Sequence, residues 1–381
     1  MGKVVALTRL TVFDEDFNIY DGIIDMIKTL QIEDHQFVFI SHDNESLRKA
    51  NKIFESTFNS KITCTFRYKF KEWVNASNVK SIILVGSSDE DLYLAANKKI
   101  LIINPGWSVK QDEKPARYGI TLSNPEKLTQ AIRLIDNQSS WYYKLQVDDS
   151  TQVLALTSAN TKNFTVTSEE KEILEGFSSL LKQGNRRYFN SLYFHLISGV
   201  MKDSDLRNVD IWSVFPTSTG WPNNEIEEIK ERCRYLTGKR NNQPIFIRHT
   251  VVDKSHFTHH DKRLEVGCAK HFNSVMLNPN YKKKIKGKTI CIIDDFLTNG
   301  ISFETARNLL LKAGAAKVIL LALGRFKRGT YGIYQKEEYD INGDIFTKNY
   351  NFERASKENI NGIYDESSRY EVRNIYNIIY S

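Results

Sequence analysis

Apolar runs and helically spaced apolar residues alternate along the first third of the chain. Apolar runs typical of buried strands occur at 4–7, 36–41 and 100–104, helical spacing occurs at 22–30 and 45–58, and the segment 80–98 combines a strand, a loop and a helix. Strands that alternate with helices are typical of α/β layer folds. We therefore predict that residues 1–135 form a Rossmann-like α/β domain with a parallel sheet.

The same alternation returns in residues 136–330, for which we predict a second α/β domain. Thr167 and Glu170 fit a capping box at the start of a helix that Gly184 ends, and another helix is predicted at 188–201. Four apolar strands, separated by helical segments near 224–236, 261–272 and 303–313, are predicted at 210–216, 243–249, 288–295 and 316–325. Continuous Val, Ile and Leu runs predict a parallel sheet with helices on both faces.

Two segments have weaker patterns. Residues 105–150 contain several prolines around a short helix at 126–134, and we predict that they form a connection with some structure of its own. Residues 331–381 are rich in tyrosine, with Gly and Asn turns. We predict a C-terminal extension of irregular structure and short strands, packed on the second domain.

The composition indicates the cellular compartment and limits the kinds of partner that we expect. With 381 residues, 41% of them hydrophobic, the chain can bury the cores of two domains. Four widely separated cysteines form no CxxC pair, which is typical of reduced side chains in the cytoplasm; they are Cys64, Cys233, Cys268 and Cys291. The first residues are too polar for a secretory signal, and no window is apolar enough to span a membrane. We expect a cytoplasmic protein without membrane contact.

The net charge favours an anionic ligand. Lys and Arg number 53 against 46 Asp and Glu, which gives +7, but the charges are interspersed rather than gathered in one tract. The basic clusters Lys282–Lys288 and Arg325–Arg328 would have to share one face to bind nucleic acid. Nucleic acid is therefore an alternative partner that composition does not favour.

One predicted strand ends in two adjacent carboxylates, Asp294 and Asp295, before a Thr-Asn-Gly turn and a helix. Ligands of open parallel sheets bind beyond the carboxyl ends of the strands. The amides of a helix N-terminus, with the hydroxyls of Thr298 and Ser302, suit a phosphate, and Gly300 permits close approach or a positive φ. The carboxylates suit hydroxyl donors instead. A ribose 5-phosphate offers both groups.

The run IIDDFLTNGIS resembles the signature of type I phosphoribosyltransferases, in which four apolar residues, two acids and two apolar residues precede Thr-Thr-Gly-x-Thr/Ser. The helix and strand that follow also match that family's order. The resemblance implies that Asp294 and Asp295 hold the ribose hydroxyls of phosphoribosyl pyrophosphate. It implies that the 5′-phosphate is bound by Thr298, Asn299, Gly300, Ile301 and Ser302. Asn299 replaces the common second Thr.

The resemblance also implies a pyrophosphate site. The family places a pyrophosphate loop after the first strand of the domain, and this chain has there Thr217, Ser218, Thr219 and Gly220, without the Arg or Lys that is common in that loop. Arg248 follows the second strand and precedes a polar segment that contains Lys254. Both cations are assigned to pyrophosphate. Mg²⁺ would be bound through the ligand, with no direct protein ligand assigned.

The implied activity is transfer of phosphoribose to a nucleobase-like acceptor with release of pyrophosphate, and no catalytic residue is assigned. A non-catalytic sensor of phosphoribosyl pyrophosphate or a nucleotide is the alternative. A homodimer is also left open. A zinc site is a rival interpretation of one segment, because two ligand pairs have suitable spacing: His256 with His259, and Cys268 with His271.

The acidic strand end has two simpler interpretations. It could be a solvated Asp-Asp turn without function, but the following turn and helix argue against this. It could be the Mg²⁺-binding strand of a P-loop NTPase, which requires GxxxxGK[ST]. The nearest candidate, Gly287-Lys288-Thr289, has Lys282 at the first glycine and precedes a strand, so this interpretation fails.

The first domain resembles the haloacid-dehalogenase-like hydrolases at two motifs. Residues 40–41, after a strand, are similar to motif II, and residues 85–97 are similar to the magnesium-binding motif IV. Gly86 and Asp91 match motif IV, but Ser87 stands where its first acid belongs. The resemblance covers about a quarter of the chain.

The nucleophile motif of that family is missing. It would fall at residues 8–11, which read TRLT and contain neither aspartate. Asp14 and Asp16 lie beyond the strand and lack the Gly-Thr turn. The resemblance therefore implies a degenerate domain, inactive as a phosphatase, that serves binding, regulation or assembly.

Overall fold

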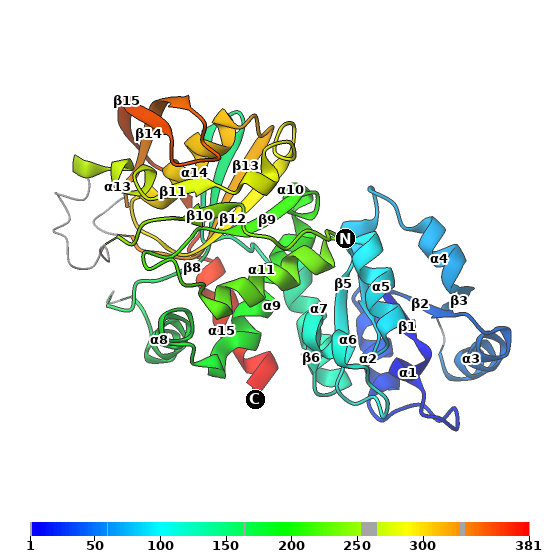
Figure 1. The fold of residues 1–381 in the computed structure, drawn as a ribbon. Helices are drawn as coiled ribbons and strands as arrows, with labels where there is room; N and C mark the ends of the chain where they lie inside the picture. The colour runs from blue at the N-terminus through cyan, green and yellow to red at the C-terminus, as the bar shows by residue number, and fades with distance from the viewer. Residues whose placement is uncertain (1, 59, 163–164, 253–264, 328–331, 381) are drawn as a thin grey trace.

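The computed structural model describes residues 2–58, 60–162, 165–252, 265–327 and 332–380. Figure 1 shows two α/β units, one in blue and cyan and the other in green through red. Each unit is built on one six-stranded sheet.

The first sheet is parallel throughout, with the strand order β3-β2-β1-β4-β5-β6. Its strands are β1 (Val4–Thr8), β2 (Gln36–Ser41), β3 (Thr63–Phe66), β4 (Ile82–Val85), β5 (Leu101–Pro105) and β6 (Ile120–Leu122). The helices are α1 (Arg9–Val12), α2 (Ile23–Ile32), α3 (Asn44–Thr57), α4 (Arg67–Trp73), α5 (Asp89–Lys98), α6 (Glu113–Tyr118) and α7 (Pro125–Asn137). The strand order reverses between β1 and β4, and a crevice forms at such a switch point.

The second sheet is mixed, with the order β16-β7-β8-β13-β12-β9. Its strands are β7 (Tyr143–Asp148), β8 (Thr151–Ser158), β9 (Ile211–Val214), β12 (Thr289–Leu297), β13 (Lys317–Arg325) and β16 (Ile363–Tyr364). Strands β8, β13, β12 and β9 are parallel, whereas β7 runs antiparallel to both β8 and β16. The prediction of a wholly parallel second sheet was therefore wrong at this edge.

Successive residues of the second sheet face two different apolar clusters. Cys291 and Ile293 of β12 belong to the cluster that continues into the first unit, while Ile290 and Ile292 belong to the other. Burial of both faces explains why the strand is apolar at every position from 290 to 293. The first face is covered by α8 (Ser168–Gln183), α9 (Phe189–Lys202), α11 (Asn224–Leu236) and α15 (Ser368–Tyr380).

The opposite face is covered by α14 (Ile301–Lys312) and two small antiparallel sheets. One pairs β10 (Phe246–Arg248) with β11 (Val275–Leu277), and the other is a hairpin of β14 (Tyr334–Gly343) and β15 (Tyr350–Ile360). Short helices also occur at α10 (Ser204–Arg207) and α13 (Ala269–Phe272), and single 3-10 turns at η1 (Val79–Ser81), η2 (Arg186–Tyr188) and η4 (Pro279–Tyr281). Figure 1 shows the hairpin in orange beside α14.

Three sequence predictions require correction. The apolar run at 243–249 forms only the short β10, outside the main sheet, because its partner is β11 rather than a parallel strand. The segment 105–150 has structure of its own, as expected, but it is more than a connection, since it contributes β6 and β7 to the two main sheets. The extension after 331 forms a long hairpin and a 13-residue helix instead of irregular structure.

The two units share an apolar boundary. The rings of Tyr118 in α6 and Tyr235 in α11 stack with centroids 4.2 Å apart, and Lys99 Nζ donates to Asn208 Oδ1 at 2.7 Å. One hydrophobic cluster runs through both units without interruption. Within the described residues, no helix combines the length and the apolar character that a membrane crossing requires.

Candidate functional site

The predicted phosphate turn connects β12 to α14. β12 pairs with β13 as far as Leu297, and the helix begins at Ile301 after Gly300, whose φ is +88°. A Cβ atom at Gly300 would lie 2.3 Å from the ring of Tyr334. Glycine is therefore required here both by the backbone conformation and by the close approach of β14.

The carbonyl groups of the turn accept hydrogen bonds from β13 and β14, whereas three amides after the turn have no acceptor among the described residues. Arg325 donates to the Thr298 carbonyl, and the Gln335 amide donates to the Asn299 carbonyl at 2.9 Å. In the described part of the chain, the amides of Gly300, Ile301 and Ser302 have no hydrogen-bond acceptor, and no side chain caps the helix. Free amides at the start of a 12-residue helix are suited to an anion.

The two acids lie directly before this turn, half-buried, on the same strand. Asp294 Oδ1 accepts from the Asp295 amide at 2.9 Å, and Asp295 Oδ1 accepts from the Phe296 amide at 2.6 Å. The other Asp295 oxygen forms an ion pair with Lys182 at the end of α8, and the Lys182 ammonium lies 5.2 Å from the Phe296 ring centroid. Lys182 therefore shares the site with the carboxylates.

Burial raises the pKa of Asp294 far above its usual range, and the neighbouring charge of Asp295 adds to the effect. Lys182 and Arg248 oppose the shift but do not cancel it. Near neutral pH the pair therefore tends to retain a proton.

The raised pKa of Asp294 has a consequence for stability. The folded state holds this proton to higher pH than the unfolded state, so stability falls as pH rises from the ordinary pKa of aspartate, 3.8, to the raised value. We expect Asp294→Asn to stabilise the protein by about 1–3 kcal/mol above the raised pKa, with the gain vanishing at low pH. Thermal unfolding of the two proteins from about pH 4 to about pH 9 measures it.

Asp340→Asn, an exposed change on β14, is the matched control and should show no such trend. A gain of the same size at every pH, or a loss of stability above neutral pH, would contradict the assigned proton.

The predicted pyrophosphate loop lies beside the acidic strand, because the Phe215 amide donates to the Ile293 carbonyl at 3.1 Å. Gly220 ends the loop with a φ of +81°, and Thr217 Oγ1 donates to the Trp221 carbonyl at 2.6 Å. Ser218 accepts at its carbonyl from the amide of Val252 at 3.0 Å. The structure thus brings this loop to the same edge of the sheet as the phosphate turn.

Arg248 connects the loop with the phosphate turn. Its Nη2 donates to the Pro216 carbonyl at 3.0 Å and lies 3.4 Å from His271 Nδ1, while His271 Nε2 lies 3.5 Å from Ser302 Oγ. Burial lowers the pKa of Arg248 to about 10, which leaves it charged at neutral pH. Burial and Arg248 lower the pKa of His271 to about 3, so this imidazole is neutral. Arg248 supplies the cation that the loop itself lacks.

Several predicted residues cannot be placed. Lys254, His256 and His259 lie outside the described residues, as does Arg328 of the second basic cluster. Cys268 Sγ lies 3.5 Å from the Ile301 carbonyl. No group of three or more His, Cys, Asp or Glu side chains suited to a metal occurs in the described ranges. The zinc interpretation gains no support there.

Sequence reasoning missed three residues of the site: Lys182, His271 as a neighbour of Ser302, and Tyr334 beneath Gly300. Lys182 lies 113 positions before Asp295, on the polar side of a helix whose apolar face was identified. No local spacing connects such residues. The Gly300 signal could have indicated a close neighbour, although not which one.

In the first unit, the residues of the degenerate motifs also come together. Thr8 ends β1 and its Oγ1 lies 3.3 Å from Asp91 Oδ2, while Arg67 forms an ion pair with Asp91. Ser87 is buried. Asp14 lies apart from them, where it accepts bonds from the amides of Asp16 and Asn18 in its own turn.

Comparisons with known proteins give one limited likeness. No protein-family model and no curated protein matches the chain. Among solved structures, part of the chain is similar to a D,D-heptose 1,7-bisphosphate phosphatase from Burkholderia thailandensis. The identity is 17%, over 27% of this chain and 77% of that chain, and the TM-score is 0.23. A TM-score of this size supports no conclusion about shared activity.

Proposed function

We propose that the C-terminal unit binds phosphoribosyl pyrophosphate and transfers its phosphoribose to a nucleobase-like acceptor, with release of pyrophosphate. One observation carries the proposal. Three amides at the start of α14, which have no acceptor among the described residues, follow two half-buried carboxylates of β12 after a four-residue segment, 296–299. Amides bind the 5′-phosphate and carboxylates accept hydrogen bonds from the ribose hydroxyls, so the two ends of one sugar phosphate match the two ends of the turn.

Lys182 and Arg248 have distinct roles in this proposal. Lys182 forms an ion pair with the Asp295 carboxylate. A ribose hydroxyl must therefore bind this carboxylate beside the ammonium or displace it. Arg248, beside the 217–220 loop, offsets the charge of the pyrophosphate. In the reaction the C1–oxygen bond to pyrophosphate breaks and its electron pair leaves with pyrophosphate. An acceptor nitrogen forms the new bond to C1, and the proton of that nitrogen passes to the released pyrophosphate.

The donor set fits Mg²⁺ bound by the ligand rather than by the protein. Both carboxylates already accept amide hydrogen bonds, and Asp295 is paired with Lys182. When bound to the phosphate oxygens of the ligand, Mg²⁺ would neutralise charge on the leaving pyrophosphate. Arg248 and the loop would then hold the pyrophosphate oxygens in position.

A non-catalytic sensor of phosphoribosyl pyrophosphate is the second candidate. The Lys182–Asp295 ion pair favours it, because an acid already neutralised by a cation stabilises a developing sugar cation less than a free carboxylate does. The enzyme and the sensor would bind the ligand with the same residues, so only a test for pyrophosphate release distinguishes them.

Calorimetric titration with phosphoribosyl pyrophosphate and Mg²⁺ tests the proposal. We expect binding that is stronger than that of ribose 5-phosphate or of pyrophosphate alone, because only the whole ligand reaches both the turn and Arg248. Pyrophosphate release is then measured over a panel of nucleobases. Release with one base above the rate without a base supports the enzyme, and binding without release supports the sensor. Absence of binding would refute both.

A further inference from the structure

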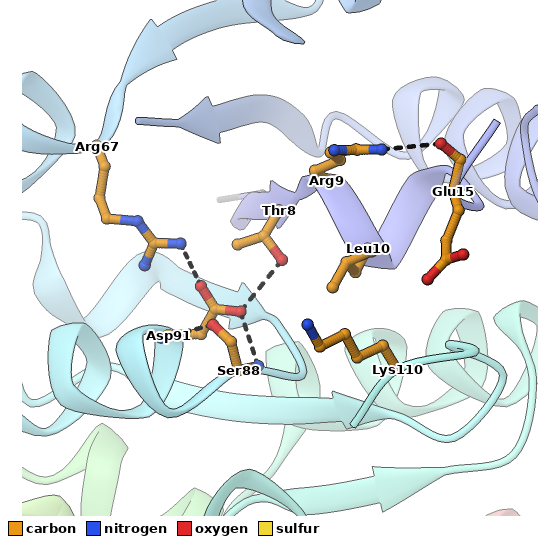
Figure 2. Close-up of a pocket in the computed structure, with 8 residues that line it drawn as sticks. All are labelled: Thr8, Arg9, Leu10, Glu15, Arg67, Ser88, Asp91 and Lys110. Atoms are coloured by element: carbon orange, nitrogen blue, oxygen red, sulfur yellow. Dashed lines mark hydrogen bonds and ion pairs between the residues drawn. The ribbon is translucent and has the colours of Figure 1, made fainter. Parts of the chain in front are cut away.

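Basic side chains of both units gather at the amino ends of the two main sheets. Lys99 follows α5 and comes just before β5, and Arg207 ends α10, which leads into β9. Lys99 Nζ donates to Oδ1 of Asn208, the neighbour of Arg207, at 2.7 Å across the boundary of the units. This place is at the opposite end of the first sheet from Thr8 and Asp91, which Figure 2 shows.

Lys239 brings a third cation to the same boundary. It follows α11, in a turn that approaches the end of α5 closely, since a Cβ atom at Gly238 would lie 3.2 Å from the Ala96 carbonyl. Burial lowers the pKa of Lys99, and the charges of Lys239 and Arg207 lower it further. The three cations are therefore near enough to repel one another.

The acids nearby do not balance these cations. Asp210 pairs with Lys239 at 3.3 Å and accepts from an amide of β12 at 3.1 Å, so it offsets one charge. Asp203 acts on Arg207 from the start of α10, where its Oδ1 already accepts from two amides of that helix. Lys288 acts on Asp210 and adds a fourth cation. Four cations against two acids leave an excess of two positive charges.

Arg207 retains donors for which the described part of the chain offers no acceptor. Its side chain is 7% exposed, and it forms neither an ion pair nor a hydrogen bond with any described residue. Nη1 is the nitrogen of this guanidinium that has no accessible surface, so Nε and Nη2 are still open to a ligand. A nearly buried charge without a partner is costly, and its retention indicates a missing acceptor.

We propose that these cations bind a phosphate-type dianion, either free phosphate or the terminal phosphate of a larger metabolite, at the boundary of the two units. A dianion matches the excess of two positive charges. Lys99 and Lys239 would act as point charges, and Arg207 would donate its remaining N–H groups to two oxygens of the anion. A phosphate has enough oxygens to accept from all three side chains at once.

Such an anion would strengthen the boundary between the units. Its oxygens would bind Lys99 of the first unit and Arg207 of the second, and its charge would relieve the repulsion between them. The site lies at the amino ends of β9 and β12, whereas the turn proposed to bind phosphoribosyl pyrophosphate follows the carboxyl end of β12. The two sites are therefore separate, and this inference does not depend on the proposed function.

Hydrogen exchange of the full chain, followed by mass spectrometry, locates the anion. The probes are inorganic phosphate and glycerol 2-phosphate, with sodium chloride at equal ionic strength in parallel. We expect phosphate to protect residues 96–101, 204–210 and 236–240 and to raise the melting temperature more than chloride does. Stronger protection of these residues by the ester would identify a phosphorylated metabolite as the ligand, and stronger protection by inorganic phosphate would identify the free ion. Protection confined to residues 298–304 would assign the phosphate to the turn after β12 and overturn the proposal.

Two variants and one control define the contribution of these cations. Lys99→Gln removes a half-buried charge while glutamine can still donate to Asn208, and we expect phosphate to bind about three- to fivefold more weakly. Arg207→Gln should weaken binding about tenfold or more, the effect of one lost charged hydrogen bond.

Lys52→Gln, an exposed change on α3, which Figure 1 shows on the far side of the first unit, should leave phosphate binding unchanged. Because Arg207 is nearly buried and its loss could disturb α10, the comparison of Lys99→Gln with Lys52→Gln decides the matter. Equal phosphate binding by these two proteins, or equal stabilisation by phosphate and chloride, would refute the proposal.

Discussion

Replacing Asp294 and Asp295 together by asparagine is expected to weaken binding of phosphoribosyl pyrophosphate about 100-fold or more. Above the raised pKa of Asp294 both acids are charged. Each would then accept a hydrogen bond from a ribose hydroxyl, and a charged acceptor contributes about 1.5–3 kcal/mol. Two such losses amount to at least about 3 kcal/mol, or about two decades in the dissociation constant. Asparagine retains the oxygens that bind the amides of Asp295 and Phe296, so the turn itself should persist. Calorimetry measures the change.

A control variant distinguishes the loss of these two acids from a general change in net charge. Asp340→Asn removes one exposed carboxylate of the same unit, far from the turn in sequence, and should leave affinity unchanged. Ribose 5-phosphate should lose affinity in parallel with the full ligand in the double variant, because it carries the same hydroxyls. Unchanged affinity for both ligands would show that these carboxylates do not contact the ribose.

Arg307→Met is expected to destabilise the protein by about 3–5 kcal/mol, the cost typical of leaving a buried charge unpaired. Arg307 is 1% exposed, and its guanidinium contacts Glu304 at 2.7 Å, Asp148 at 3.0 Å and the Glu337 carbonyl at 2.9 Å. Glu304 is itself fully buried, so loss of Arg307 leaves its carboxylate without a counter-charge, although Tyr334 and the Glu337 amide still donate to it. Unfolding in urea, followed by tryptophan fluorescence, measures the difference.

Two further variants define this cost. Arg307→Met with Glu304→Gln should recover part of the stability, because the amide carries no charge that needs a partner. Lys282→Met breaks an exposed ion pair with Asp344, at 2.7 Å, and should cost about 1 kcal/mol or less. A loss from Arg307→Met as small as that from Lys282→Met would mean that water reaches Glu304.

The central strands of both sheets could be predicted because they are buried on both faces. β4 and residues 290–293 of β12 are apolar at every position, which is typical of a strand with both faces covered. β14 could not be predicted in the same way, because its buried residues include Gln335 and Glu337. Their burial depends on Arg307 and Asn308 of α14, which donate to the Glu337 carbonyl. The pattern of hydrophobic residues cannot indicate this hydrogen-bond network between α14 and β14.

The candidate site likewise has a part that could be predicted from the local sequence and a part that could not. The turn after Asp295 is local in sequence, and its Gly300 has the positive φ that the sequence indicated. Lys182 and His271 reach the site only through the packing of α8 and α13, which depends on the whole unit. The direct contact of Arg248 with the carbonyl of Pro216 likewise could not follow from spacing, because β10 left the main sheet.

Helix α15 has a consequence for the timing of assembly during synthesis. Its buried residues Val372, Ile375 and Ile378 belong to the apolar cluster shared by both units, and Arg369 pairs with Glu170 of α8 at 2.7 Å. Residues 368–380 leave the ribosome long after the helices they cover. Until then α8, which carries Lys182, lacks part of its support. A nascent chain would thus form the first sheet early and complete the site at the end of β12 only after these late residues emerge.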